Sequence, residues 1–247
     1  MPDSGLLEAF EVHSPESIQK ALTDGVSPVD LIQGKRPIDH LIATYLRSPR
    51  FADCLRVMLS AGASISDPLL EAVLLDDSSK LLRLVTDNPQ CVHRKLDMLG
   101  AFTSCRGVTA LHICAEFNSV RCARVLLENG ADVNAAADCD LVGMGAQTPI
   151  FHAVNGILNY CRPVMELLVE AGANLRAQVK SLLWGEAMSW ETVLYDVTPV
   201  SYAQCGLYRQ FHRREEDVYS NLQYLYRRMY GTEPEIRNVP NRYLVGR

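Results

Sequence analysis

Short apolar runs recur along the chain, and each is followed by a residue that can end a helix. Val125–Leu127 precedes Gly130, and Leu167–Val169 precedes Gly172. Glycine readily adopts the left-handed conformation that closes a helix, and asparagine tolerates it next best. The pattern therefore predicts a helix before each such position. The corresponding residues elsewhere in the chain are Gly25, Gly62 and Asn88.

A second, shorter helix is predicted upstream of each apolar run. Thr148 and Thr198 are each followed by a proline, which suits the first helical position because its missing N–H would have no intrahelical partner there. A threonine hydroxyl can also accept a hydrogen bond from the free N–H groups of the first turn. The other predicted helix starts are Ser4, Arg36, Asp67 and Thr109, of which Arg36 alone has no capping side chain.

The segment Gly107–Ala115, followed by Gly130–Asn134, resembles one unit of the ankyrin repeat, whose Thr-Pro-Leu-His-x-Ala signature recurs about every 33 residues. The signature returns in degraded form at Thr148–Ala153 and Thr198–Ala203. The resemblance implies antiparallel helix pairs joined by hairpin-like loops that project from one edge. Only His112 occupies the family's histidine position; the residues that replace it are Leu7, Asp39, Leu70, Phe151 and Ser201.

The resulting fold prediction is an all-α, ankyrin-type helical solenoid of about six helix-turn-helix repeats with extended hairpin-like loops. We expect a single array over residues 1–231, with units starting near positions 4, 36, 67, 109, 148 and 198, and a C-terminal tail over 232–247. A hydrophobic content of 48% is ample for such an array. Each unit of a solenoid contacts only its neighbours, so the array can exceed the usual size of one core.

The spacing between units changes half-way along the chain. Successive helix starts lie 32 and 31 residues apart, and then 42, 39 and 50. The three connections after Asn88, Gly130 and Gly172 are therefore enlarged. Because such connections emerge on one edge of the array, we expect the three insertions to lie side by side, and insertions on one face often mark a binding face.

The longest insertion, Leu175–Val197, contains both tryptophans of the chain. Two interpretations are open. It is either a projecting finger whose aromatic residues anchor a partner, or a hairpin or short helix that packs its apolar residues on the array, since a large exposed apolar patch reduces solubility. The middle insertion, Ala135–Ala146, is rich in glycine and alanine and carries two isolated apolar residues. The candidate partner-binding residues of the two insertions are Leu141, Met144, Trp184, Met188, Trp190 and Tyr195.

We predict no catalytic residues, because no nucleophile has a base in reach. Cys114 lies two residues from His112, and residues two apart on a helix point in different directions. Cys205 and His212 are separated by Gly206, and only a continuous helix would bring them together. The glycines Gly143 and Gly145 do not form a phosphate-binding fingerprint, because no strand precedes them and no third glycine follows.

Composition narrows the classes of function that remain possible. A net charge of −5 and a pI near 5.7 argue against a nucleic-acid partner. Cysteines and histidines are too dispersed for a metal site, and we expect no cofactor. The N-terminal residues do not have the pattern of a secretion signal, and no stretch is apolar enough to span a membrane. Together with eight scattered cysteines, this predicts free thiols and a cytoplasmic monomer.

We therefore expect a non-catalytic scaffold that binds a protein partner through its concave face and its clustered long loops. A stack of helical units binds more often than it catalyses. The alternative function is an enzyme or a small-ligand-binding protein whose site is formed by the loop insertions.

Overall fold

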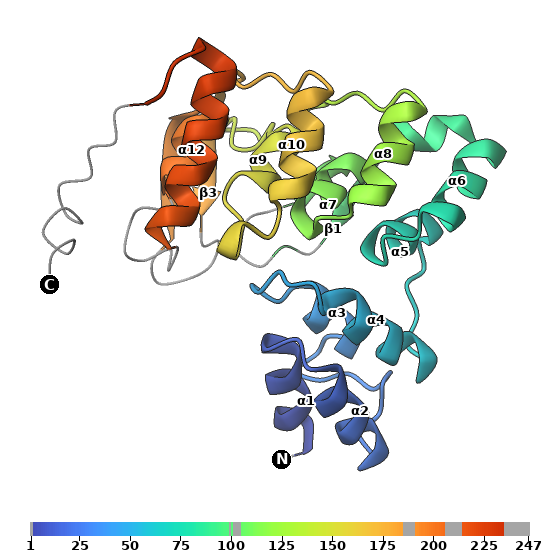
Figure 1. The fold of residues 1–247 in the computed structure, drawn as a ribbon. Coiled ribbons are helices and arrows are strands. Elements are labelled where there is room, and N and C mark those ends of the chain that lie inside the picture. The colour runs from blue at the N-terminus through green and yellow to red at the C-terminus, as the bar shows by residue number, and fades with distance from the viewer. Residues whose placement is uncertain (1, 99, 101–104, 185–190, 206–213, 235–247) are drawn as a thin grey trace, which may run out of the picture.

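The computed structural model describes residues 2–98, 100, 105–184, 191–205 and 214–234. Within these residues the α-helices form six consecutive antiparallel pairs (Figure 1). The pairs are α1 (Pro2–Glu11) with α2 (Pro15–Thr23), α3 (Pro37–Ile42) with α4 (Phe51–Ser60), α5 (Pro68–Leu74) with α6 (Ser78–Asp87), α7 (Ala110–Phe117) with α8 (Val120–Glu128), α9 (Pro149–Ala153) with α10 (Arg162–Glu170), and α11 (Pro199–Cys205) with α12 (Glu215–Tyr230).

Capping side chains fix two of the predicted helix starts. The Asp67 carboxylate accepts hydrogen bonds from the backbone N–H groups of Leu69 and Leu70, at 2.9 and 3.3 Å. The Thr198 hydroxyl accepts one from the Ser201 N–H at 3.2 Å. Both caps are therefore confirmed, and each satisfies donors that the helix leaves free.

Other predicted starts need correction. Helix α1 begins at Pro2, so Ser4 lies inside its first turn and is not the cap; proline is well suited to that first position. Thr148 does precede α9, but its buried hydroxyl has no hydrogen-bond partner among the described residues. Arg36 makes no capping bond, as expected, and its guanidinium binds Asp39 instead.

Glycine ends the second helices as predicted, with φ values of +100° at Gly25, +86° at Gly130 and +93° at Gly172. Helix α6 does end at Asn88 as predicted, but Asn88 is not left-handed, because its φ is −143°. Pro89 follows directly, and a proline favours an extended backbone in the residue before it. The chain continues into the 3-10 helix η1 (Pro89–His93).

The helices form two layers. The first helices α5, α7 and α9 pack side by side, and the second helices α6, α8 and α10 form a parallel row (Figure 1). Helix α12 continues that row and is attached to the fifth pair by hydrogen bonds from Asn221 to the Val154 carbonyl and from Asn159, in the 3-10 helix η2 (Ile157–Asn159), to the Asp217 carbonyl. The apolar core lies between the layers and is continuous from pair to pair.

His112 links the fourth pair to the fifth. Its Nδ1 accepts a hydrogen bond from the Thr109 N–H at 3.0 Å, so Nε2 carries the proton and donates to the Gln147 carbonyl at 3.0 Å. Burial and the neighbouring His152 lower the pKa of His112 to about 3. The ring is therefore neutral, and its hydrogen bond to the Gln147 carbonyl connects adjacent units. The other units lack this hydrogen bond, because another residue replaces the histidine.

The enlarged connections contain strands, so the all-α prediction was incomplete. The first connection forms an antiparallel hairpin of β1 (Lys95–Met98) and β2 (Cys105–Thr109), and the third forms one of β3 (Val179–Trp184) and β4 (Thr192–Val197). Both contain β-branched residues that favour an extended backbone. In these two insertions, the strands therefore satisfy their backbone N–H and C=O groups by hydrogen-bonding to each other.

The array is bent between the second and third pairs. In Figure 1, α1 to α4 lie below α7 rather than extending the row. The connection before α4 reaches past the third pair to the fourth: Arg47 forms an ion pair with Glu116 at 3.0 Å, and the Phe51 and Phe117 rings lie 4.7 Å apart. Tyr45 and Arg47 therefore line a common pocket with residues of the first helices α7, α9 and α11 and of both hairpins.

Candidate functional site

The three insertions lie side by side and are hydrogen-bonded to one another, as the unit spacing predicts. The Asp138 N–H donates to the Arg106 carbonyl of β2 at 3.1 Å, and the Gly145 N–H donates to the Ser181 carbonyl of β3 at 3.1 Å. Lys95 adds an ion pair with Asp138 at 2.6 Å. We call residues 95–98, 105–109, 135–147, 179–184 and 192–197 the loop cluster.

Glycine is required at one point where the loop cluster folds on itself. Gly145 has a φ of +113°, and a Cβ atom added there would lie 2.4 Å from the Asp138 carbonyl oxygen. Gly143, two residues away, also has a positive φ, but its nearest neighbour would be the Lys180 side chain at 3.1 Å. Only the Gly145 contact involves backbone, which cannot move aside as a side chain can.

Some of the predicted partner-binding residues are available on the surface of the loop cluster. Leu141 is fully exposed, together with its neighbour Val142, and the Tyr195 side chain on β4 is 73% exposed. Met144 is half-buried and its backbone bridges to Ser181 of β3. The middle insertion therefore lies along the edge of β3 that is not paired with β4. Leu141 and Tyr195 thus belong to one hydrogen-bonded structure.

Trp184 does not project. It is only 8% exposed, and its ring packs edge-on against Tyr202 of α11 with centroids 6.2 Å apart. The finger interpretation is wrong for this residue, because β3 lies against the array and buries Trp184 and Leu182. Met188 and Trp190 lie outside the described residues.

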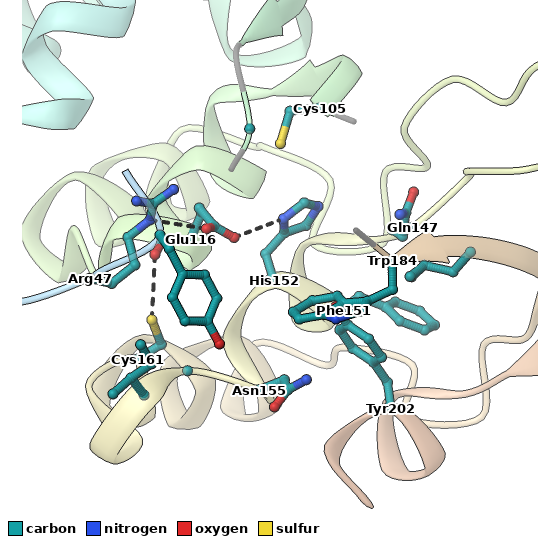
Figure 2. Close-up of a pocket in the computed structure, with 15 residues that line it drawn as sticks. Arg47, Cys105, Glu116, Gln147, Phe151, His152, Asn155, Cys161, Trp184 and Tyr202 are labelled. Carbon is teal, nitrogen blue, oxygen red and sulfur yellow. Dashed lines mark hydrogen bonds and ion pairs between the residues drawn. The ribbon is translucent and has the colours of Figure 1, made fainter. Parts of the chain in front are cut away.

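Trp184 instead lines a pocket (Figure 2). The pocket has a volume of about 80 Å³. Its walls come from the second, fourth, fifth and sixth helix pairs and from both hairpins. Its main lining side chains are Arg47, Glu116, Phe151, His152, Trp184 and Tyr202.

Three polar residues cross one end of the pocket. Glu116 accepts from Arg47 at 3.0 Å and from Nδ1 of His152 at 3.3 Å. The side chains of Arg47 and His152 are 6% and 7% exposed, and that of Glu116 is 27% exposed. Burial by itself raises the pKa of Glu116, but the charge of Arg47 and the hydrogen bonds from both partners outweigh it and hold the pKa at about 2. Glu116 is therefore a carboxylate.

The ionised carboxylate determines how the His152 ring is oriented. A carboxylate can only accept, so the proton lies on Nδ1. The other ring nitrogen, Nε2, is turned away from Glu116 and is buried without a hydrogen-bond partner in the described chain (Figure 2). Buried polar atoms normally have a partner, and an unsatisfied one costs about 1 to 3 kcal/mol.

The pocket does not offer an activated thiol. Burial raises the pKa of Cys105 to about 12, and the Cys161 thiol donates to the Glu116 carbonyl at 3.5 Å. A thiol held in its protonated form is a poor nucleophile. Among the described residues there is also no group of three or more His, Cys, Asp or Glu side chains placed to hold a metal ion. The polar side chains at this end of the pocket form a hydrogen-bonded network of Arg47, Glu116 and His152.

The sequence model described as "Ankyrin repeats (3 copies)" matches residues 48–179, which is more than half of the chain. The chain belongs to the ankyrin-repeat family. The matched segment extends from just before α4 to the first residue of β3, so it includes Glu116, His152 and the middle insertion. Ankyrin repeats are generally protein-protein interaction modules and are typically non-catalytic.

In the described part of this ankyrin-repeat chain, no helix combines the length and the apolar character needed to cross a bilayer. All eight cysteines lie among the described residues and are free thiols.

Sequence analysis did not find Arg47, Glu116 or His152. Arg47 lies 69 residues before Glu116 in sequence, in a connection outside the repeat signature. Charged residues are mostly exposed, so nothing in the pattern marks these as buried. The one available signal was His152, which directly follows the family's histidine position at Phe151.

Proposed function

We propose that this ankyrin-repeat chain is a non-catalytic scaffold that binds one protein partner through its concave face and its loop cluster. The observation that carries this proposal is the hydrogen-bonded junction of all three insertions, which holds exposed Leu141 and Tyr195 on one structure. A surface that is already ordered loses little conformational entropy on binding. Exposed tyrosine and leucine side chains provide the apolar contact area that such an interface needs.

The alternative function, a small-ligand-binding protein, is favoured by one observation, the pocket that residues of both hairpins help to line. An enzyme is disfavoured, because the thiols that line the pocket are held protonated. We further propose that binding needs no cofactor, that the partner is not a nucleic acid, and that the chain acts as a cytoplasmic monomer. The net charge of −5 and the free cysteines support these assignments.

Site-specific photo-crosslinking tests the proposed surface. We would place a photoreactive phenylalanine analogue at Tyr195 or Leu141 and irradiate the protein in an extract of its host. The matched control carries the analogue at Leu82, an exposed leucine on α6 in the outer row. We expect one discrete crosslinked protein from positions 195 and 141 and none from position 82. Identical crosslinking from all three positions, or none from any, would overturn the proposal.

A further inference from the structure

The hydrogen-bonded series of the loop cluster ends in two strand edges, one at β1 and one at β4. The edges between them are covered by the middle insertion: the Arg106 carbonyl of β2 accepts from Asp138, and the Ser181 carbonyl of β3 accepts from Gly145. No described strand pairs with the outer edge of β1 or of β4. Such an edge presents backbone N–H and C=O groups, which are a template for pairing with another chain.

The two outer edges differ in regularity. The register of β1 against β2 shifts between Leu96 and Met98, and β1 begins with the charged Lys95. Bulges and charged side chains are features that protect an edge from pairing. In contrast, β4 pairs with β3 without a shift from Thr192 to Tyr195. Of these two edges, the one at β4 is therefore better suited to receive a further strand.

The hydrogen bond of Ser181 shows which backbone groups of β4 are directed to its outer edge. In an antiparallel pair, opposite residues either exchange both hydrogen bonds or direct their groups away from each other, and the two types alternate. Ser181 lies opposite Tyr195, and its carbonyl is directed away from β4, to Gly145. This pair is therefore of the second type, and so is Leu183 with Val193, two residues along. The N–H and C=O groups of Val193 and Tyr195 thus point outward.

The outward groups of β4 are available for pairing. Within the described chain, the backbone groups of Val193 and Tyr195 have no hydrogen-bond partner beyond the hairpin. The side chain of Val193 is half-buried, and that of Tyr195 is 73% exposed. The regular edge ends at Asp196, whose φ is +52°. An added strand therefore pairs with a short stretch of backbone centred on Leu194.

The side chains along this edge specify the chemistry of the added strand. Residues opposite each other on adjacent strands contact one another, and aromatic and β-branched residues form the favourable pairs. Val193 and Tyr195 are of these types. Proline cannot donate to the ladder, so it is excluded from the paired positions. The occupant is an extended segment with β-branched or aromatic residues at alternate positions.

We infer that an extended segment of the protein partner adds a strand to the outer edge of β4, where its backbone exchanges hydrogen bonds with Val193 and Tyr195. This inference rests on the proposed function, which supplies the partner and includes Tyr195 in its binding surface. In strand addition, main-chain hydrogen bonds give affinity and alternate side chains give specificity. The pairing of β4 with β3 holds the edge extended before the partner binds, which lowers the ordering cost.

Amide hydrogen exchange followed by NMR tests the edge in the unmodified protein. In the free protein we expect the amides of Val193 and Tyr195 to exchange rapidly and that of Leu194, which pairs with Leu182 of β3, to exchange slowly. The probe is a synthetic peptide that covers the position crosslinked by the analogue at Tyr195, located in the captured protein by mass spectrometry. A saturating concentration of this peptide should slow exchange at Val193 and Tyr195 at least tenfold.

A matched pair of variants separates the backbone from the side chain. Val193→Pro removes one outward N–H and leaves the hydrogen bonds of the hairpin in place, and an edge strand tolerates proline where its N–H faces solvent. It should weaken binding of the peptide at least tenfold. The control Val193→Thr retains the N–H and a β-branched side chain, and it should bind normally.

A modified peptide gives a readout that does not depend on the folding of a variant. Because alternate residues of a strand direct their N–H groups to the same side, N-methylation of one alternating set should abolish binding. N-methylation of the other set should leave binding in place.

Slow exchange at Val193 and Tyr195 in the free protein would overturn the inference, because the edge would already be paired, within the chain or with a second copy. Peptide binding that leaves both amides in rapid exchange, or equal binding of the two N-methylated peptides, would also overturn it. Crosslinking at position 195 would in those cases still support the proposed surface. Absence of crosslinking would instead overturn the proposed function, so the two failures are distinguishable.

Discussion

Two buried histidines connect neighbouring helix pairs through hydrogen bonds, one where the repeat pattern is strongest and one where it is weak. His112 connects adjacent units, and His13, in the turn between α1 and α2, contacts Ser48 and Thr44 of the next pair at 2.8 and 3.1 Å. Burial lowers the pKa of His13 to about 4, and the charge of Arg47 lowers it further in the same direction. Both rings are neutral in the folded protein.

We expect the free energy of unfolding to fall as the pH decreases from 7.5 to 5.5. The folded pKa values of about 4 and about 3 lie below the unfolded value of 6.5, so the unfolded chain binds more protons below pH 6.5. Over this window each histidine contributes about 1.4 kcal/mol in total, which gives about 3 kcal/mol for the two. Urea unfolding at pH 7.5 and pH 5.5 measures this fall in the free energy of unfolding.

The control is His93→Gln, which replaces an exposed histidine and should leave the pH dependence unchanged. Glu116 does not contribute in this window, because its stabilisation is lost only as the pH falls from 4.5 toward its folded pKa of about 2. A flat profile between pH 7.5 and 5.5 would show that the histidines are not held neutral.

At the scale of elements, the sequence predicts helices better than it predicts connections. Caps and glycine ends are local signals, so Asp67, Thr198 and Gly130 were recognised from a few neighbouring residues. Asn88 ends α6 as predicted, but it is not left-handed, because Pro89 restricts its conformation. A hairpin was one of the two interpretations of Leu175–Val197, and the structure has it as β3 and β4. The hairpin of β1 and β2 and the contact of Gly145 with Ser181 were not predicted, because they depend on how separate insertions meet. The pocket is harder still to predict, since its walls come from four helix pairs and both hairpins.

Replacing Gly145 by alanine should disrupt the middle insertion more than replacing Gly143. Both residues have a positive φ, but only the Cβ at position 145 would overlap backbone, at 2.4 Å from the Asp138 carbonyl oxygen. We expect Gly145→Ala to cost about 2 kcal/mol beyond Gly143→Ala, a typical cost of local strain. Thermal unfolding gives the difference, and faster hydrogen exchange of the Asp138 and Gly145 amides locates it. Equal effects of the two variants would contradict this account of the loop cluster.

At the scale of the whole molecule, the bend brings the second helix pair onto the fourth and closes the concave face. The Arg47–Glu116 ion pair connects the two pairs, and the Arg47 guanidinium also lies 4.3 Å from the centre of the Phe117 ring. Arg47 is almost completely buried, so its loss affects both the charge balance of the pocket and the packing of the bend.

Arg47→Met should destabilise the protein by about 3 kcal/mol, because it leaves the Glu116 carboxylate without its cationic partner while retaining apolar contact with Phe117. The double variant Arg47→Met with Glu116→Gln should recover most of this loss. The control is Arg56→Met, whose exposed ion pair with Asp53 should contribute less than about 1 kcal/mol. Urea unfolding measures all four proteins. A loss in Arg47→Met no larger than in Arg56→Met would mean that the ion pair does not stabilise the bend.

The central claim is that the loop cluster binds a protein partner, and the affinity of the crosslinked partner for surface variants tests it most directly. Leu141 and Tyr195 are exposed, so the double variant Leu141→Ala with Tyr195→Ala should retain the melting temperature of the unmodified protein. We predict that it binds the partner at least tenfold more weakly, as expected for loss of interface anchors, while Leu82→Ala binds normally. Unchanged affinity of the double variant, at unchanged melting temperature, would contradict the account.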